Sequence, residues 1–245
     1  MDAAPSLAER MRGYELASRV VLPARTYTII RVDGCRFSAY TRRLTKPFDD
    51  ALTDALDAAA LALCGRVQGA AFAYASSDEI SLLACDFAQE NTQAFLGGRL
   101  DKIVSIGAST VTAAFNAARA AGGAEAHATF DGRAFVIPDP TEVANYFVWR
   151  QRDALRNAVS AVAETHLGRR ALHGLNRVQR LEALTAAGVD FEDYPLRHRQ
   201  GRLVTRQEFS ARALDGRPVL RHRWAVTPAT LFDVGGLRTL IPGAP

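Results

Sequence analysis

Two apolar runs joined by a very short polar segment constrain the fold of this chain more than any other feature. Residues 69–75 (GAAFAYA) and 80–87 (ISLLACDF) have the composition of strands, and only residues 76–79 (SSDE) separate them. Such a short connection indicates a hairpin turn, and a hairpin joins antiparallel strands. Residues 25–32 alternate between apolar and polar side chains and predict a further strand, as do residues 128–138 (ATFDGRAFVIP). We therefore predict an antiparallel sheet.

Stretches with helical patterns lie between and after these strands. Residues 48–67 place apolar side chains on one helical face, and residues 91–121 are helical apart from two glycines that can split them. Residues 141–168 predict one long helix that begins at a Thr cap and ends at a glycine. Residues 1–20 predict a polar helical arm. The fold class is therefore α+β, an antiparallel sheet with helices packed on one face.

The length and composition suit a globular protein with one large domain or two small ones. The chain has 245 residues, of which 48% are apolar, enough for a substantial core. We expect a main domain over residues 1–160, including the N-terminal arm, and an arginine-rich extension over residues 161–245; a second compact domain there is the alternative. No run approaches the roughly 20 apolar residues of a membrane span, and the charged N-terminus lacks the apolar centre of a signal peptide. We therefore expect a cytoplasmic protein that does not bind membranes.

Cysteine content and charge narrow the classes of function. Cys35, Cys64 and Cys85 are an odd number without a CxxC spacing, so they predict neither a disulfide framework nor a zinc site. The net charge of +4 is too small to diagnose nucleic-acid binding by itself. All but two of the 30 basic residues are arginines, however, and they crowd the later part of the chain. Planar guanidinium groups suit phosphate, although a GC-rich genome explains the bias equally well.

The acids Asp33 and Asp78 carry the main chemical hypothesis. Asp33 directly follows the predicted strand at 25–32, and Asp78 lies in the turn of the hairpin. If these strands are neighbours, both carboxylates reach the same edge of the sheet, where they repel each other unless a divalent cation lies between them. With the Gly34 carbonyl and substrate phosphates, they form an arrangement that holds Mg²⁺ for nucleotidyl transfer. The alternative is that DG and SSDE are only turn sequences.

Basic residues near the predicted strand ends are compatible with a triphosphate substrate. Arg31, Arg36, Lys46 and Arg133 lie at or near these ends, where they could pair with phosphate oxygens. Taken singly, each of them is more often a solvated surface charge. No P-loop, GxGxxG or GxSxG motif is present, which removes the commoner nucleotide-binding and hydrolase classes.

Several segments, taken in order, match the sequence patterns of a known family. Residues 31–50 (RVDGCRFSAYTRRLTKPFDD), 76–83 (SSDEISLL) and 130–157 resemble, in order and spacing, the tRNA-His guanylyltransferase family, and residues 180–204 resemble it more weakly. The resemblance implies a core like the palm domain of polymerases and the addition of nucleotides to the 5′ end of tRNA in the 3′–5′ direction. It also implies two Mg²⁺ ions, ATP for activation of the 5′ end, GTP or another NTP as the added nucleotide, and a homodimer or homotetramer.

The resemblance also assigns residues to roles. Asp33 and Asp78 fall on the family's catalytic, metal-binding aspartates, and the carbonyl of Gly34 falls on its backbone metal ligand. The residues assigned to nucleotide binding are Arg31, Arg36, Phe37, Lys46, Asp49, Ser77, Glu79, Arg99, Lys102 and Arg133. The residues that we expect to bind RNA are Arg150, Asn157, Arg180, Arg197, Arg199 and Arg202, the last three because of their charge and not because of the resemblance. The last three of these belong to a basic cluster that is equally well the charged edge of a hairpin.

Departures from the family patterns bear on the substrate. Phe48 replaces the Asn of the family's KPND segment, and Cys35 replaces a basic residue. Residues 155–161 (LRNAVSA) keep only Asn157 of the family's HINNLYN stretch, which accompanies work on tRNA-His. Its loss is typical of the guanylyltransferase-like members, the 3′–5′ RNA polymerases that repair 5′-truncated tRNAs. We therefore expect 5′-end repair rather than dedicated G addition; the alternatives are a non-catalytic RNA- or nucleotide-binding module, or a palm-type enzyme that acts on NTP alone.

Overall fold

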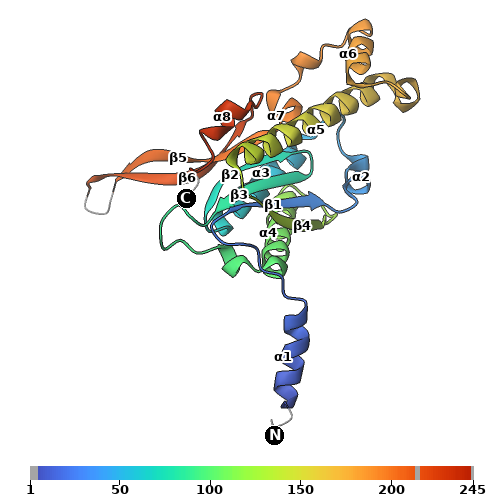
Figure 1. Cartoon of the computed structure of the whole chain (residues 1–245). Coiled ribbons are helices and arrows are strands. Elements are labelled where there is room, and N and C mark those ends of the chain that lie inside the picture. Colours follow the sequence, from blue (N-terminus) through green and yellow to red (C-terminus); the bar gives the residue numbers. More distant parts are fainter. Residues whose placement is uncertain (1–4, 213–215, 244–245) are drawn as a thin grey trace.

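The protein is built around a six-stranded antiparallel sheet with the strand order β4-β1-β3-β2-β5-β6 (Figure 1). A computed structural model describes residues 5–212 and 216–243. The strands are β1 (Tyr27–Gly34), β2 (Ala70–Ser76), β3 (Glu79–Cys85), β4 (Phe130–Ile137), β5 (Arg202–Arg212) and β6 (Pro218–Pro228). The helices are α1 (Leu7–Ala17), α2 (Phe37–Tyr40), α3 (Asp50–Arg66), α4 (Leu100–Ala121), α5 (Pro140–Leu167), α6 (Arg177–Ala186), α7 (Leu196–Arg199) and α8 (Val234–Arg238). The predicted α+β fold class is confirmed.

The predicted hairpin is formed by β2 and β3. Ser76 pairs with Glu79, so the connection is a two-residue turn made of Ser77 and Asp78. Ser77 has a φ of +49°, and the turns that suit a two-residue hairpin require such a positive φ at their first central position. On its other side β3 pairs with β1, and β1 pairs with β4. The turn between β2 and β3 therefore lies at the edge where β1 ends.

Helices cover both faces of the sheet, whereas the sequence analysis expected them on one face. Ile30 and Val32 of β1 pack in one core with α3 and α4, while Tyr27 and Ile29 pack in another with α5 and α8. The reason is visible in β3, in which all seven residues are buried. A strand with consecutive apolar residues exposes apolar side chains on both faces, so each face needs cover. The consecutive apolar residues 82–85 were the signal for this second layer.

The long helix α5 starts two residues earlier than expected. Its N-cap is Asp139 rather than Thr141, and the Asp139 carboxylate accepts hydrogen bonds from the backbone N–H groups of Thr141 and Glu142. Pro140 occupies the first helical turn, where a missing N–H costs nothing. The helix ends at Gly168, as predicted, with a φ of +77°. It crosses the sheet and continues beyond it (Figure 1).

The C-terminal residues share the sheet with the rest of the chain. Residues 202–205 of β5 pair with β2, and β5 and β6 then continue as a two-stranded ribbon beyond the sheet (Figure 1). At the other end of the chain, the predicted N-terminal arm is the helix α1, which extends away from the body and has no buried residue. Among the described helices, none has the length and apolar character needed to cross a membrane.

Candidate active site

The two acids singled out from the sequence lie at the same edge of the sheet. Asp33 near the end of β1 is directly opposite Glu79 of β3 and opposite Asp131 of β4. Asp78 precedes Glu79 in the β2–β3 turn, so it is next to Asp33 on the neighbouring strand. The juxtaposition that the sequence analysis expected is therefore present, and it follows from the antiparallel pairing of β1 with the hairpin.

At this edge of the sheet, burial and neighbouring carboxylates outweigh the nearby arginine charges in their effect on the pKa values of the two aspartates. Burial raises the pKa of Asp33; the nearby Arg31 lowers that pKa, and the carboxylates of Glu79 and Asp131 raise it further. Burial also raises the pKa of Asp78, and the charge of Asp33 is the next largest cause. The charge of Asp33 thus disfavours ionisation of Asp78, an effect that a divalent cation between the two carboxylates would reverse.

The donor set at this edge fits Mg²⁺. The available ligands are the carboxylates of Asp33 and Asp78 and the backbone carbonyl of Gly34. Within residues 5–212 and 216–243, no three His, Cys, Asp or Glu side chains gather into a metal-binding group. Mg²⁺ commonly binds to one or two carboxylates and completes its shell with water and substrate phosphate oxygens. Gly34 is required here because a Cβ at this position would lie 2.4 Å from Cδ2 of Phe37.

A cleft of about 350 Å³ opens beside Asp78, a volume within the range of small-molecule sites. Its lining brings together several residues that the sequence analysis assigned to ligand binding: Phe37, Lys46, Asp49, Ser77, Asp78, Asn157 and Arg202. An apolar part of the wall is made by Leu44, Phe48, Leu52, Leu56, Ala154, Ala158 and Ala161. The cleft therefore combines a charged end at the sheet edge with an apolar wall between α3 and α5.

The loop that precedes α3 is held in place by Asp49 and leaves Lys46 exposed. The Asp49 carboxylate accepts a 2.8 Å hydrogen bond from the Leu52 N–H and a 3.3 Å hydrogen bond from the Thr45 N–H. Asp49 is the N-cap of α3, so the structure gives it a structural role in shaping the cleft. Lys46, in contrast, lines the cleft and is an exposed residue.

Phe48, which stands where the family pattern has Asn, is packed against α7. Its ring is stacked on His198 with the ring centroids 4.8 Å apart and the planes 2° from parallel. His198 Nε2 is 2.9 Å from Oδ1 of Asp50, the first residue of α3. The aromatic pair thus joins the start of α3 to α7 and forms part of the cleft wall.

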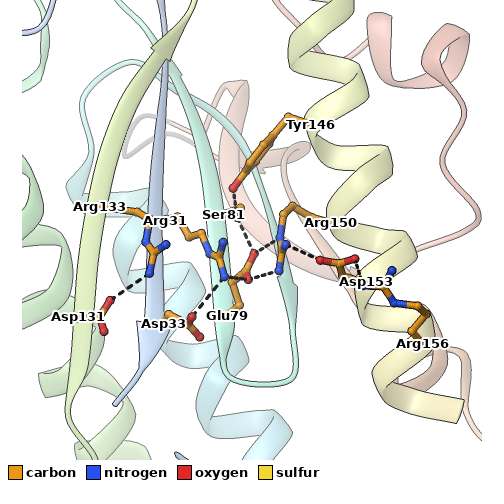
Figure 2. A network of polar contacts seen from close by, with 10 residues as sticks. All are labelled: Arg31, Asp33, Glu79, Ser81, Asp131, Arg133, Tyr146, Arg150, Asp153 and Arg156. Carbon is orange, nitrogen blue, oxygen red and sulfur yellow. Dashed lines mark hydrogen bonds and ion pairs between the residues drawn. The ribbon is translucent and has the colours of Figure 1, made fainter. Parts of the chain in front are cut away.

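Three residues that the sequence analysis assigned to ligands are paired with one another instead. Figure 2 shows Glu79 between the guanidinium groups of Arg31 and Arg150. Arg150 on α5 donates from Nε and Nη2 to the two Glu79 oxygens, at 2.7 and 2.5 Å. Arg31 Nη2 is 2.6 Å from Oε2 of Glu79 and 3.3 Å from Oδ2 of Asp33. Because Arg150 is engaged inside the protein, its predicted contact with RNA has no support in the structure.

The remaining predicted nucleotide contacts fall into two groups. Arg133 on β4 lies directly opposite Arg31, is exposed, and is 3.9 Å from Asp131, so it belongs to the Asp33 edge. Arg36, two residues after Gly34, is exposed and has a φ of +52°. Arg99 and Lys102 lie near the start of α4, where Arg99 pairs with Asp101. Neither of these two residues lines the cleft beside Asp78.

The predicted RNA contacts at residues 197–202 are committed to partners within the chain. Arg197 pairs with Asp54 and Asp57 of α3, and Arg202 donates to Oδ1 of Asp57 at 2.6 Å. Arg199 pairs with Glu192, and both Arg199 and Arg202 are buried. Burial contradicts an RNA contact by either of these two arginines. The sequence signal that was missed is the spacing of Asp50, Asp54 and Asp57, which places three acids on one face of a helix.

Two other predicted RNA contacts have different surroundings. Arg180 on α6 is half-buried and donates to the backbone carbonyl of Leu175 at 3.0 Å. Asn157 on α5 is exposed and lines the cleft. Asn157 is therefore placed where it can contact a ligand in the cleft.

The sheet with its paired aspartates and cleft is compatible with a nucleotidyltransferase, and comparison with known families agrees. The family model of tRNAHis guanylyltransferase (Thg1) matches residues 8–138, more than half of the chain. The chain therefore belongs to the tRNAHis guanylyltransferase family, whose members are nucleotidyltransferases. The resemblance stated from the sequence motifs is confirmed, as is the prediction that the protein is an enzyme.

Solved structures and a curated relative describe what the chain is similar to. A bacterial tRNA(His) guanylyltransferase (Thg1)-like protein in complex with ATP is 34% identical, with a TM-score of 0.88 over 97% of this chain and 99% of that chain. A bacterial Thg1-like protein in complex with GTP gives a TM-score of 0.81 at 34% identity, over 97% of each chain. The tRNA(His) guanylyltransferase of Schizosaccharomyces pombe is 32% identical over 162 residues, which are 61% of this chain and 57% of that protein.

Proposed function

We propose that this protein is a Mg²⁺-dependent nucleotidyltransferase that adds nucleotides to the 5′ end of tRNA or tRNA-like RNA in the 3′–5′ direction. The observation that carries the proposal is the placement of Asp33 and Asp78 on neighbouring strands beside a nucleotide-sized cleft. The bacterial Thg1-like proteins in complex with ATP and with GTP support purine triphosphates as substrates. The proposal includes a homodimer or homotetramer in the cytoplasm, where tRNA and nucleoside triphosphates are available.

The residues present divide the chemistry between the two ends of the cleft. Asp33, Asp78 and the Gly34 carbonyl would hold two Mg²⁺ ions, which neutralise phosphate charge and activate the attacking hydroxyl group when bound. Lys46 supplies a cation to the phosphates from within the cleft, and the exposed Arg133 supplies a planar guanidinium group at the Asp33 edge. The apolar wall excludes water from the base and orients the nucleotide, which lowers the entropic cost of the reaction.

Repair of truncated 5′ ends is the activity we favour over dedicated G addition. The segment that corresponds to HINNLYN is LRNAVSA here, and its small Ala158 and Ala161 line the cleft. Side chains of this size provide no hydrogen bonds that would select a single base. Asn157, the one retained position, is exposed at the same wall. With such a wall, the incoming nucleotide can be selected by its base pairing with the opposite RNA strand.

The proposal is tested by following the addition of labelled NTPs to a tRNA that lacks its first nucleotide, with Mg²⁺ and with either a monophosphate or a triphosphate at the 5′ end. We expect Asp33→Asn and Asp78→Asn to lower the extension rate at least about 100-fold, equivalent to about 2.7 kcal/mol of transition-state stabilisation. Asp193→Asn is the matched control, because Asp193 is exposed and lies outside the site.

Two results would overturn the proposal in different ways. RNA binding without extension, at both kinds of 5′ end, would identify a non-catalytic binding module. Metal-dependent consumption of NTP that is unaffected by RNA would identify a palm-type enzyme that acts on NTP alone. Extension by both aspartate variants at the rate of Asp193→Asn would remove the metal site from the reaction.

A further inference from the structure

We propose that Glu79 is a positioning residue that takes the shorter contact of the Arg31 guanidinium group, 2.6 Å against 3.3 Å to Asp33, and so keeps the Asp33 carboxylate available to a divalent cation. This inference rests on the proposed function, because it concerns the metal site of that reaction. It explains why an acid follows Asp78 directly in the chain without being a metal ligand. It also gives new roles to Arg31, Glu79 and Arg150, which the sequence analysis assigned to nucleotide and RNA.

The Glu79 carboxylate has no oxygen left for a metal ion. Its Oε1 accepts hydrogen bonds from Arg150 Nε at 2.7 Å and from Ser81 Oγ at 3.0 Å. Its Oε2 is 2.5 Å from Nη2 of Arg150 and 2.6 Å from Nη2 of Arg31. Figure 2 shows the Glu79 side chain directed toward α5, along the sheet face that also carries Ser81. A buried carboxylate with four donors is a fixed anion, because moving it would leave these donors unpaired.

Arg31 lies between two carboxylates and is closer to Glu79. Its Nη2 is 2.6 Å from Glu79 and 3.3 Å from Asp33. A guanidinium group that paired fully with Asp33 would occupy the oxygens that a metal ion needs and would repel that ion electrostatically. The Glu79 carboxylate draws Arg31 toward itself and therefore favours metal binding at Asp33.

Arg150 fixes Glu79 from the opposite side. It reaches across from α5, contacts both Glu79 oxygens and is itself held by Asp153 Oδ2 at 2.8 Å. Asp153 in turn accepts from Arg156. The chain of contacts from Asp33 through Arg31, Glu79, Arg150 and Asp153 to Arg156 contains equal numbers of acids and arginines (Figure 2). Loss of Glu79 would leave an uncompensated positive charge beside Asp33.

The test uses Mn²⁺ as a paramagnetic substitute for Mg²⁺ and measures its binding to the full chain without RNA or NTP. Its dissociation constant is obtained by electron paramagnetic resonance, and the Mg²⁺ concentration for half-maximal extension is measured in parallel. We expect Glu79→Gln to weaken Mn²⁺ binding at least about tenfold, because Arg31 then pairs with Asp33. Arg31→Met should bind Mn²⁺ at least as tightly as the native protein. Glu182→Gln, on the exposed face of α6, is the matched control.

The double variant Arg31→Met/Glu79→Gln separates positioning from a purely structural role. Positioning predicts that removing Arg31 restores Mn²⁺ binding to within about threefold of the Arg31→Met value, since no competing cation remains. A structural role predicts that the double variant binds no better than Glu79→Gln, and this result would overturn the inference. If Glu79→Gln does not fold, Arg31→Met decides alone, because weaker Mn²⁺ binding in that variant contradicts the inference.

Failure of the inference and failure of the proposed function give different patterns. If the native protein binds Mn²⁺ and Asp78→Asn abolishes the binding, while Glu79→Gln leaves it unchanged, the metal site stands and the inference falls. If neither Asp33→Asn nor Asp78→Asn changes Mn²⁺ binding, the metal site itself is absent and the proposed function falls with it.

Discussion

The ion pair between Asp57 and Arg202 is the point at which we expect the C-terminal segment to be most sensitive to substitution. The Asp57 carboxylate accepts from Arg202 Nε at 2.6 Å and lies 3.4 Å from Arg197 Nη2. Arg202 has 4% of its side chain exposed, and its Nη2 is buried without another hydrogen-bond partner. Asp57→Ala would therefore leave a buried guanidinium group with no compensating charge. Breaking a buried pair from one side costs about 3–5 kcal/mol.

For a chain of this length, that free energy corresponds to a lowering of Tm by roughly 6–20 °C, at about 2–4 °C per kcal/mol. Thermal unfolding followed by circular dichroism or calorimetry measures the change. Asp54→Ala is the matched control on the same helix: Asp54 also pairs with Arg197, but 65% of its side chain is exposed, so we expect a loss below about 1 kcal/mol. Equal losses for the two variants would refute the argument that burial decides the strength of this contact.

Three further predictions concern the site. Asp78→Asn should raise the free energy of unfolding of the metal-free protein more at about pH 7.5 than at about pH 4.5, as measured by urea titration. The pKa of Asp78 is raised in the native state, so the native state binds more protons there than the unfolded state does. The ionised Asp78 therefore destabilises the fold increasingly as the pH rises through the native pKa. Gly34→Ala should abolish 5′ extension while leaving RNA binding measurable by filter retention, because its Cβ would clash with Phe37. Phe48→Ala should weaken GTP binding about three- to tenfold in a fluorescence titration, because it removes the ring that stacks on His198 in the cleft wall; unchanged affinity would show that this wall does not contact the nucleotide.

Local patterns in the sequence were sufficient to predict β1 to β4 and the meeting of Asp33 and Asp78, whereas β5 and β6 were not predicted. The reason is that a two-residue turn determines which residues of β2 and β3 are paired, and a strand that ends in an acid beside this hairpin brings that acid to the turn. The second helical layer was missed although the apolar run in β3 indicated it. A strand that is buried on both faces cannot be covered by helices on one side.

Contacts between distant segments were beyond the reach of local patterns. Arg150 and Glu79 are 71 residues apart in the chain and meet because α5 crosses the sheet above β3. In the sequence, each of these two residues is only a charged residue near a predicted site, so Glu79 was assigned to nucleotide binding and Arg150 to RNA binding. The same holds for Arg199 and Arg202, whose acidic partners were not identified until the structure placed α7 and β5 near Glu192 and Asp57.

The most direct test of the central claim is the identity of the nucleotide added to the 5′ end of a tRNA that lacks its first residue, measured for four RNAs that differ only in the nucleotide opposite the gap. A repair enzyme of the kind proposed here predicts that the labelled nucleotide incorporated in each RNA is the complement of the opposing one. Incorporation of G into all four RNAs would contradict templated repair. Absence of label from all four NTPs would contradict nucleotide addition at the 5′ end altogether.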